Sequence, residues 1–229
     1  MQEVTANTTV SEQAFQVLRQ DVLSGRHAPD IKLKLDSLQS LYGFSSSPLR
    51  EALNRLVQEG LVKADERRGF RVTSISPADL ADITKMRLML DIPALKESIQ
   101  AGDDAWEAAI VAAFHRLEKI ESRLPHGPVV LDAQWSQRHR DFHFSLIAAC
   151  PSERQLSWSM SLFDQAERYR HFAARNRTVS KKKDEEHRSL MDAVLRRDAK
   201  TAAMLLTEHI ASTQINVMAA FKRQATTRA

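Results

Sequence analysis

The sequence has 229 residues and a net charge of +4, which is enough for one large domain or for a small and a medium one. Few glycines and prolines beside abundant alanine, leucine, arginine and glutamate favour helices over sheets. A single cysteine, Cys150, excludes an intrachain disulfide, no apolar run is long enough to span a bilayer, and the polar residues 1–10 lack the apolar stretch of a signal peptide. We therefore expect a cytoplasmic protein that is not associated with a membrane.

The N-terminal quarter predicts an arm followed by two helices. Residues 1–11 show no apolar period, and we expect them to form a frayed arm. Over residues 12–24 the apolar side chains recur at helical spacing, which predicts a helix that Gly25 ends. A second helix is predicted to begin at Asp36, which can form a capping box with Gln39. Its buried side is expected to consist of Leu38, Leu41 and Tyr42.

A third helix is predicted from Ser47 to about Gly60, after a sharp turn that Gly43 allows. Ser47 can cap this helix, and Pro48 suits its first position. Its buried stripe comprises Leu49, Ala52, Leu53, Leu56 and Val57. A separate polar face comprises Ser46, Ser47, Arg50 and Asn54. Helix, tight turn and helix form the helix-turn-helix arrangement, in which the second helix is offered to DNA.

Two short runs of strand-forming residues, 61–64 and 70–73, predict a small β-hairpin, or wing. Its tip carries Arg67, Arg68 and Gly69. Residues 1–76 carry 10 Lys and Arg against 9 Asp and Glu, so a nucleic-acid footprint must come from local clusters such as this tip. Such a tip can also be a solvated hairpin end, but its place after a helix-turn-helix favours contact with phosphate or the minor groove.

A domain boundary is predicted at Ser76, because Ser76, Pro77 and Asp79 together mark a fresh helix start. The two predicted domains are residues 1–76, with the winged helix-turn-helix, and residues 77–229, which read as helical almost throughout. The predicted helices cover about 77–101, 103–124, 130–150, 152–177, 181–197 and 198–223, with a loose tail from Phe221. The fold class is therefore mainly α, with a C-terminal antiparallel bundle of about six helices.

The N-terminal part resembles the GntR family of bacterial transcription regulators. The resemblance is carried by Leu38-Gln39-Ser40-Leu41-Tyr42-Gly43-Phe44-Ser45, Pro48-Leu49-Arg50-Glu51-Ala52-Leu53, Glu59-Gly60-Leu61-Val62 and Arg68-Gly69-Phe70-Arg71-Val72. The remainder resembles the FCD effector-binding domain of the FadR subfamily through Arg87 with Asp91, Phe142-His143, Glu186-His187 and His209. The two resemblances together imply a regulator rather than an enzyme. The family's members are homodimers that bind a palindromic operator, usually as repressors, and respond to a small organic acid.

The same resemblance implies a set of DNA contacts. Arg50 stands where the family keeps an arginine at the start of its recognition helix, and Ser45 and Ser47 match positions that bind phosphates. An arginine at this place can bind guanine O6 and N7 or hold a phosphate, whereas the alternative is an ion pair with Glu51 or with the facing helix. Ser46 departs from the family, because many relatives have arginine there. Asp36 likewise replaces a DNA-binding arginine of some relatives and is expected to be a helix cap.

Four histidines have a spacing that predicts a site. His139 and His143 are four apart and share one helix face. His187 and His209 lie at equal intervals from a turn near Asp198, so an antiparallel helix pair brings them level. In the resembling FCD domains this pattern binds a divalent metal, with an acidic residue where this chain has His139. Four imidazoles suit zinc, nickel, cobalt or copper better than magnesium or calcium, and zinc is our first choice.

Alternatives to this metal site remain open at the level of sequence. The histidines can be purely structural core residues, or only three of them can bind the metal. A metal-dependent enzyme is disfavoured because no H-E-x-x-H motif is present. The other four are interpreted as surface or incidental residues: His27, His115, His126 and His171. Arg87 has two readings of equal weight, an ion pair with Asp91 four residues on and, from the resemblance, an arginine that binds a carboxylate effector.

Overall fold

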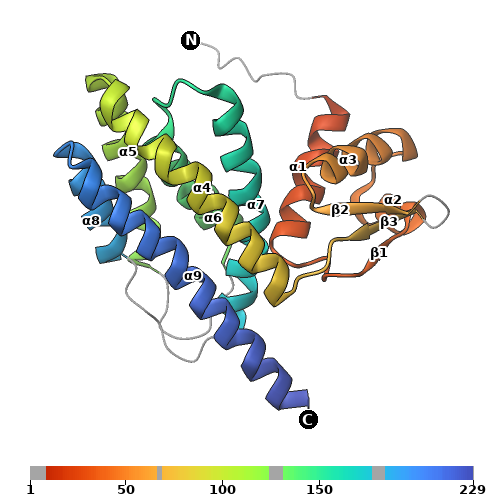
Figure 1. The fold of residues 1–229 in the computed structure, drawn as a ribbon. Helices are drawn as coiled ribbons and strands as arrows, with labels where there is room; N and C mark the ends of the chain where they lie inside the picture. The colour runs from red at the N-terminus through yellow and green to blue at the C-terminus, as the bar shows by residue number, and fades with distance from the viewer. Residues whose placement is uncertain (1–8, 66–68, 124–130, 177–183, 229) are drawn as a thin grey trace. The chain divides into compact units, whose positions relative to one another are not determined.

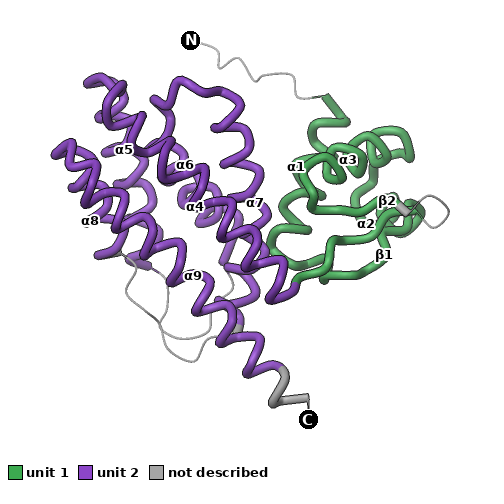
Figure 2. Tube along the Cα trace, in the orientation of Figure 1, with its two compact units in different colours: residues 1–75 green, residues 76–229 purple. Residues whose placement is uncertain are grey.

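The computed structural model describes residues 9–65, 69–123, 131–176 and 184–228, and it divides the chain into two compact units, Met1–Ile75 and Ser76–Ala229 (Figure 2). The described residues are mainly helical, with one small antiparallel sheet in the first unit (Figure 1). The predicted fold class, a winged helix-turn-helix followed by a bundle of about six helices, is confirmed. Among the described residues, no helix is both long and apolar enough to cross a membrane.

The first unit consists of three helices and three short strands. The helices are α1 (Val10–Leu23), α2 (Leu35–Tyr42) and α3 (Ser46–Gln58), and the strands are β1 (Lys32–Leu33), β2 (Val62–Asp65) and β3 (Gly69–Val72). The sheet has the order β1-β3-β2, with Val62 opposite Val72 and Lys32 opposite Arg71. Strand β1 was not predicted, because two residues are too few to show an alternating pattern.

Helix starts in this unit differ from the predictions. Helix α1 begins at Val10, because the Thr9 side chain accepts a hydrogen bond from the Glu12 backbone at 3.2 Å; the predicted arm is therefore shorter, and residues 1–8 lie outside the described residues. Helix α2 begins one residue before Asp36, with Lys34 in the cap position and no side-chain cap bond. The predicted capping role of Asp36 is wrong. Its carboxylate instead lies in the first turn, where it favours the helix dipole.

The recognition helix also begins earlier than predicted. Ser45 occupies the cap position of α3 with extended backbone, and no side chain caps the helix, so Ser47 is a first-turn residue and not the cap. Gly43 adopts φ +74° at the end of α2 and makes the tight turn. Leu41, predicted to be buried, is 49% exposed. It lies roughly 90° around the helix from the centre of the stripe that Leu35, Leu38 and Tyr42 form.

The second unit is a bundle of long helices. These are α4 (Pro77–Ala101), α5 (Asp104–Glu121), α6 (Ala133–Ile147), α7 (Glu153–Asn176), α8 (Asp184–Leu195) and α9 (Ala199–Arg228). Helix α4 packs against α7 and α9, and α5 packs against α6 and α8. Ser76, Asp103 and Asp132 cap α4, α5 and α6 by accepting backbone hydrogen bonds, as sequence reading predicts for Ser76. The middle of α6, the first turn of α8 and the first half of α9 come together in this bundle.

The C-terminal end of the bundle corrects a further prediction. Residues from Phe221 were expected to form a loose tail, but α9 continues to Arg228. Phe221 packs against Phe172 with ring centroids 4.7 Å apart, and Val217 and Ala220 are buried. These contacts keep the last turns of the helix against α7.

Candidate functional site

Four histidines from three helices meet in the interior of the second unit. His139 and His143 project from α6, His187 from α8 and His209 from α9. All four are buried, and one ring nitrogen of each lies within 4.8 Å of one such nitrogen of every other. The turn between α8 and α9 places His187 and His209 level, with ring centroids 4.9 Å apart. The sequence spacing and the structure therefore agree on which histidines are neighbours.

Several nitrogens of this cluster have no hydrogen-bond partner. Both ring nitrogens of His139 are buried without one, as are Nε2 of His143 and Nε2 of His187. A buried polar atom left unpaired costs about 1–3 kcal/mol. Such a concentration of unpaired polar atoms in one place is therefore unfavourable unless another group binds to them.

Burial and the neighbouring positive groups favour the neutral form of His139 and His143. Burial lowers the pKa of His139 well below its ordinary value, and the neighbouring His143, Arg170, His187 and His209 lower it further. Burial, followed by the neighbouring histidines and arginines, likewise lowers the pKa of His143. Neutral imidazoles offer a lone pair, which is the form that binds a metal ion.

Two glutamates are hydrogen-bonded to histidines of the cluster. His187 Nδ1 lies 3.2 Å from Glu121 Oε2, and His209 Nδ1 lies 3.2 Å from Glu186 Oε2. A carboxylate can only accept, so Nδ1 carries the proton in both histidines and Nε2 keeps the lone pair. The sequence analysis named Glu186 beside His187 but did not find Glu121. Nothing in the residues around Glu121 relates this carboxylate to a histidine 66 residues away.

Aromatic rings enclose the cluster. Trp135 stacks on His139 with ring centroids 4.5 Å apart and planes 14° from parallel. Phe163 lies 5.4 Å from both His139 and His143. Trp106 and Trp135 are core residues, whereas Trp158 is 55% exposed. The rings exclude water from the histidine nitrogens and hold the imidazoles in place.

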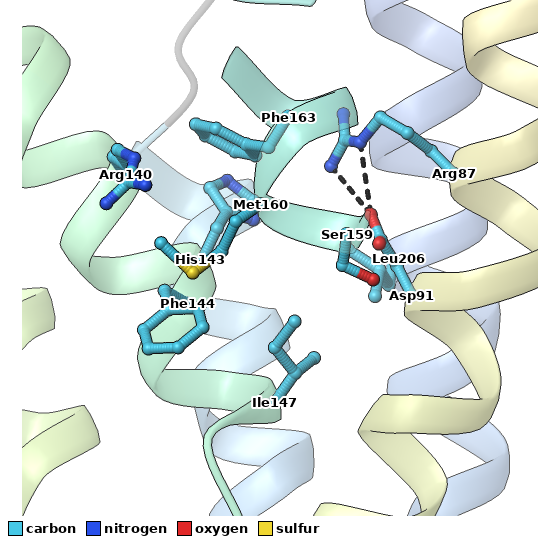
Figure 3. Close-up of a pocket in the computed structure, with 10 residues that line it drawn as sticks. All are labelled: Arg87, Asp91, Arg140, His143, Phe144, Ile147, Ser159, Met160, Phe163 and Leu206. Atoms are coloured by element: carbon cyan, nitrogen blue, oxygen red, sulfur yellow. Dashed lines mark hydrogen bonds and ion pairs between the residues drawn. The ribbon is translucent and has the colours of Figure 1, made fainter. Parts of the chain in front are cut away.

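A pocket adjoins the cluster and shares His143 with it (Figure 3). Its remaining lining residues are Arg87, Asp91, Arg140, Phe144, Ile147, Ser159, Met160, Phe163 and Leu206. In the view of Figure 3, Arg87 and Arg140 lie on opposite sides, with His143 between them. Apolar walls with a few convergent polar groups are typical of sites for small molecules.

Of the two interpretations of Arg87, the ion pair with Asp91 is present, and the effector-binding role stays a prediction. Arg87 forms a buried ion pair with Asp91 at 3.0 Å, and the same guanidinium lines the pocket. Burial lowers the pKa of Arg87, whereas Asp91 raises it. Opposite Arg87, Arg140 donates two hydrogen bonds to Asp164, at 2.8 and 3.2 Å. The pocket therefore carries positive groups that are held by carboxylates of the protein itself.

Two histidines interpreted as incidental have defined structural partners. His171 is buried, and its Nε2 lies 2.9 Å from Ser136 Oγ and 3.3 Å from Glu167 Oε1. His27 is hydrogen-bonded to Tyr42 at 2.7 Å. For His171 the surface assignment is wrong, because the face of α7 that carries it is covered by α6. His115 is exposed, and His126 lies outside the described residues.

The polar face of α3 is open to solvent. Ser45, Ser46, Ser47, Arg50 and Asn54 are all exposed. Among the described residues Arg50 has no ion pair, and Glu51 instead accepts a hydrogen bond from Ser11 at 2.6 Å. The first turn of α3 has no acidic residue, so its dipole favours an anion there. At the wing, Gly69 adopts φ +88°, whereas Arg67 and Arg68 lie outside the described residues.

The opposite face of α3 is fixed to α1. Arg55 pairs with Glu12 at 2.7 Å and lies 3.6 Å above the ring of Phe15, and Arg19 pairs with Glu59 at 2.8 Å. Buried leucines complete this contact: Leu18, Leu49, Leu53 and Leu56. A helix held so firmly on one side presents its polar side in a defined orientation.

A winged helix-turn-helix joined to a helical unit with a histidine cluster and a pocket defines a transcription regulator with an effector domain. The profile described as "Bacterial regulatory proteins, gntR family" matches residues 10–72, and that of the FCD domain matches residues 82–212. The chain belongs to the GntR family and carries an FCD domain.

Relatives of the chain are regulators as well. It is 40% identical over 201 residues to the HTH-type transcriptional regulator BphR of Paraburkholderia xenovorans. The matched region covers 88% of this chain and 82% of that protein. It is 36% identical over 207 residues to the HTH-type transcriptional repressor GlaR of Escherichia coli, with 89% and 93% covered. The structure of E. coli McbR/YncC has the same fold, with a TM-score of 0.76 at 18% identity over 94% of this chain and 99% of that one. The expectation that this protein is a regulator and not an enzyme is confirmed.

Proposed function

We propose that this protein is a repressor that binds a palindromic operator as a homodimer and releases it when a small carboxylate binds beside a metal ion in the FCD domain. The observation that carries the proposal is the junction of two features at His143: a cluster of buried histidines in which several ring nitrogens have no hydrogen-bond partner, and a pocket lined by Arg87. The relative GlaR is named a repressor, which supports the same direction of control here.

The residues of the cluster fit a divalent transition metal. A zinc–nitrogen bond of about 2.1 Å allows ligand nitrogens up to about 4.2 Å apart, and the nitrogens here lie within 4.8 Å of one another. Small rotations of the side chains therefore suffice. An all-imidazole set suits zinc, nickel, cobalt or copper and disfavours magnesium and calcium, which prefer oxygen ligands. His139, His143, His187 and His209 would hold the ion, which supplies a positive centre for a carboxylate.

Arg87 is the second carboxylate-binding group of the proposal. Its guanidinium pairs with Asp91 and also lines the pocket. An incoming carboxylate can accept from this guanidinium in a charge-assisted hydrogen bond. Binding acts on DNA affinity only to the extent that the ligand prefers one arrangement of the domains over another.

The DNA contacts of the proposal lie on α3 and the wing. Arg50 is the principal base or phosphate contact, Ser46 and Asn54 are further groove contacts, and Ser45 and Ser47 bind phosphates. Arg67, Arg68 and Gly69 form the tip that approaches the duplex. A twofold dimer matches two half-sites of a palindrome. Solvent exposure of the α3 face, with its back fixed to α1, supports this assignment.

The test uses full-length protein purified without an affinity tag. Elemental analysis is expected to find about one transition-metal ion per chain, since this cluster offers one set of ligands. Light scattering is expected to find a dimer. Operator fragments selected from random DNA should bind, and a panel of small carboxylates should release them only from metal-loaded protein.

Matched variants separate the outcomes. His143→Ala should lose both the metal and the response while still binding the operator, whereas His115→Ala, an exposed histidine of α5, should behave as the wild type. Absence of metal together with a normal carboxylate response would favour structural histidines instead. A monomer on the operator would contradict the dimer.

A further inference from the structure

We infer that Glu121 and Glu186 supply negative charge to the metal centre through hydrogen bonds to its histidines. We also infer that Glu121 is the main residue that positions the histidine ligands. This inference rests on the proposed metal site. Four neutral imidazoles contribute no charge to offset a divalent cation. Two carboxylates, each hydrogen-bonded to one ligand histidine, offset that charge without binding the ion themselves.

The direction of the hydrogen bonds decides which nitrogen faces the ion. Glu121 accepts from Nδ1 of His187, and Glu186 accepts from Nδ1 of His209. Each bond holds the proton on Nδ1 and directs the lone pair of Nε2 into the cluster. In His187 this Nε2 is buried without a partner, which is the state expected of a ligand atom facing a binding site.

Glu121 itself points to a cation. It is only 9% exposed, and among the described residues it forms no ion pair with a lysine or arginine. Its polar partners are His187 and the indole of Trp135, whose Nε1 donates to Oε1 at 3.3 Å. A buried carboxylate without a cation nearby is costly. A metal ion one imidazole away would provide the missing positive charge.

Glu121 also reaches a second ligand through Trp135. The indole that donates to Glu121 stacks on His139 at 4.5 Å. One carboxylate at the end of α5 therefore orients His187 by a direct hydrogen bond and His139 through the tryptophan ring. Glu186 is more exposed, with 28% of its side chain open, and its carboxylate lies beside His209. Water can replace part of its role, so its effect should be the smaller one.

The experiment compares Glu121→Gln, Glu186→Gln and the control Glu118→Gln. Glutamine keeps the size but has one acceptor, so it cannot accept from both Trp135 and His187. Its amide would instead donate to Nδ1 of His187 and move the proton to Nε2, which blocks metal binding. Glu118 lies on the same helix and pairs with Arg188 at the surface.

Zinc affinity is measured by competition with a chromophoric chelator, and the cobalt-substituted proteins are compared by visible absorption. Glu121→Gln should weaken zinc binding 10–100-fold, the range found for such supporting residues, and should change the cobalt spectrum. Glu186→Gln should weaken it less, and Glu118→Gln not at all. A purely structural Glu121 would lower the stability of metal-free protein without changing zinc affinity.

The outcomes are distinguishable from those of the proposed function. Zinc affinities of both variants within twofold of the wild type would overturn the inference while leaving the metal site intact. A wild-type protein that binds no transition metal would overturn both. If Glu121→Gln fails to fold, Glu186→Gln alone still decides, because its surface position makes it compatible with the fold.

Discussion

Arg87 donates to a single oxygen of Asp91: its Nε and one terminal nitrogen both lie 3.0 Å from Oδ2. The other oxygen, Oδ1, is buried without a partner. Asp91 therefore depends on Arg87, whereas the guanidinium also faces the pocket. This asymmetry would let the arginine bind the proposed carboxylate while it still pairs with Asp91 in helix α4.

Replacing Arg87 by methionine is expected to cost about 3–5 kcal/mol of unfolding free energy, because it leaves Asp91 as a buried, uncompensated charge. The double variant Arg87→Met, Asp91→Leu should recover most of that loss. Chemical denaturation measures both, with the exposed Lys85→Met of the same helix as the control, which should stay within about 0.5 kcal/mol of the wild type. Equal stability of Arg87→Met and wild type would contradict the argument that Asp91 needs Arg87 to compensate its buried charge.

Arg50→Ala is expected to weaken operator binding, because Arg50 is exposed on α3 without an ion pair of its own among the described residues. A contact with guanine would be worth about 1–3 kcal/mol and would relax specificity at one base pair. A phosphate contact would instead lower affinity for all sequences and reduce the salt slope by about one. Titrations at several salt concentrations distinguish these cases, with Arg116→Ala of the other unit as the control. Unchanged affinity would exclude Arg50 from the interface.

Acid should destabilise the second unit through Glu167. Burial alone would raise its pKa, but Arg170, His171 and Ser136 together lower it to about 2, from an ordinary 4.5. A lowered folded-state pKa gives stability that is complete above pH 4.5 and is lost as the pH falls towards 2, about 3 kcal/mol in total. Denaturation between pH 7 and 2 should show this loss. Glu167→Gln should flatten the slope, and the exposed Glu153→Gln should not.

Gly102→Ala should destabilise the bundle by a steric clash. A Cβ at this position would lie 2.2 Å from a ring carbon of Trp106. The indole cannot move away freely, because its Nε1 donates to the Ser145 carbonyl at 2.8 Å. Overpacking of this kind costs about 1–3 kcal/mol. Adding Trp106→Leu should remove the clash, so thermal denaturation of the single and double variants should show clear non-additivity.

Local spacing accounts for the parts of the site that could be predicted. His139 and His143 share a face because four residues make about one helical turn. His187 and His209 are level because their intervals to the turn at Asp198 are equal. Gly43 and the apolar stripe of α3 likewise identified the helix-turn-helix, because a turn glycine and helical spacing can both be recognised from neighbouring residues. Each of these inferences needs only the geometry of one helix or of one hairpin.

Contacts distant in sequence account for what could not be predicted. Glu121 meets His187 across 66 positions, and no periodicity relates two residues on different helices. His171 was interpreted as incidental although it is buried against α6, and Leu41 was expected to be buried although it is 49% exposed. A pattern shows which residues share a face, but not which faces find a partner.

The sequence by itself determined the class of this protein, its winged helix-turn-helix, its helical bundle and its four neighbouring histidines, because these follow from periodicity, turn residues and motif spacing. Only the tertiary structure decided how those histidines are supported. Packing of α5 against α6 and α8 brings Glu121 to His187 and Trp135 to His139, and packing of α4 against α7 buries Arg87 with Asp91 at a pocket wall. Burial, hydrogen-bond direction and compensating charge are properties of the assembled helices, so they appear only when the helices are packed.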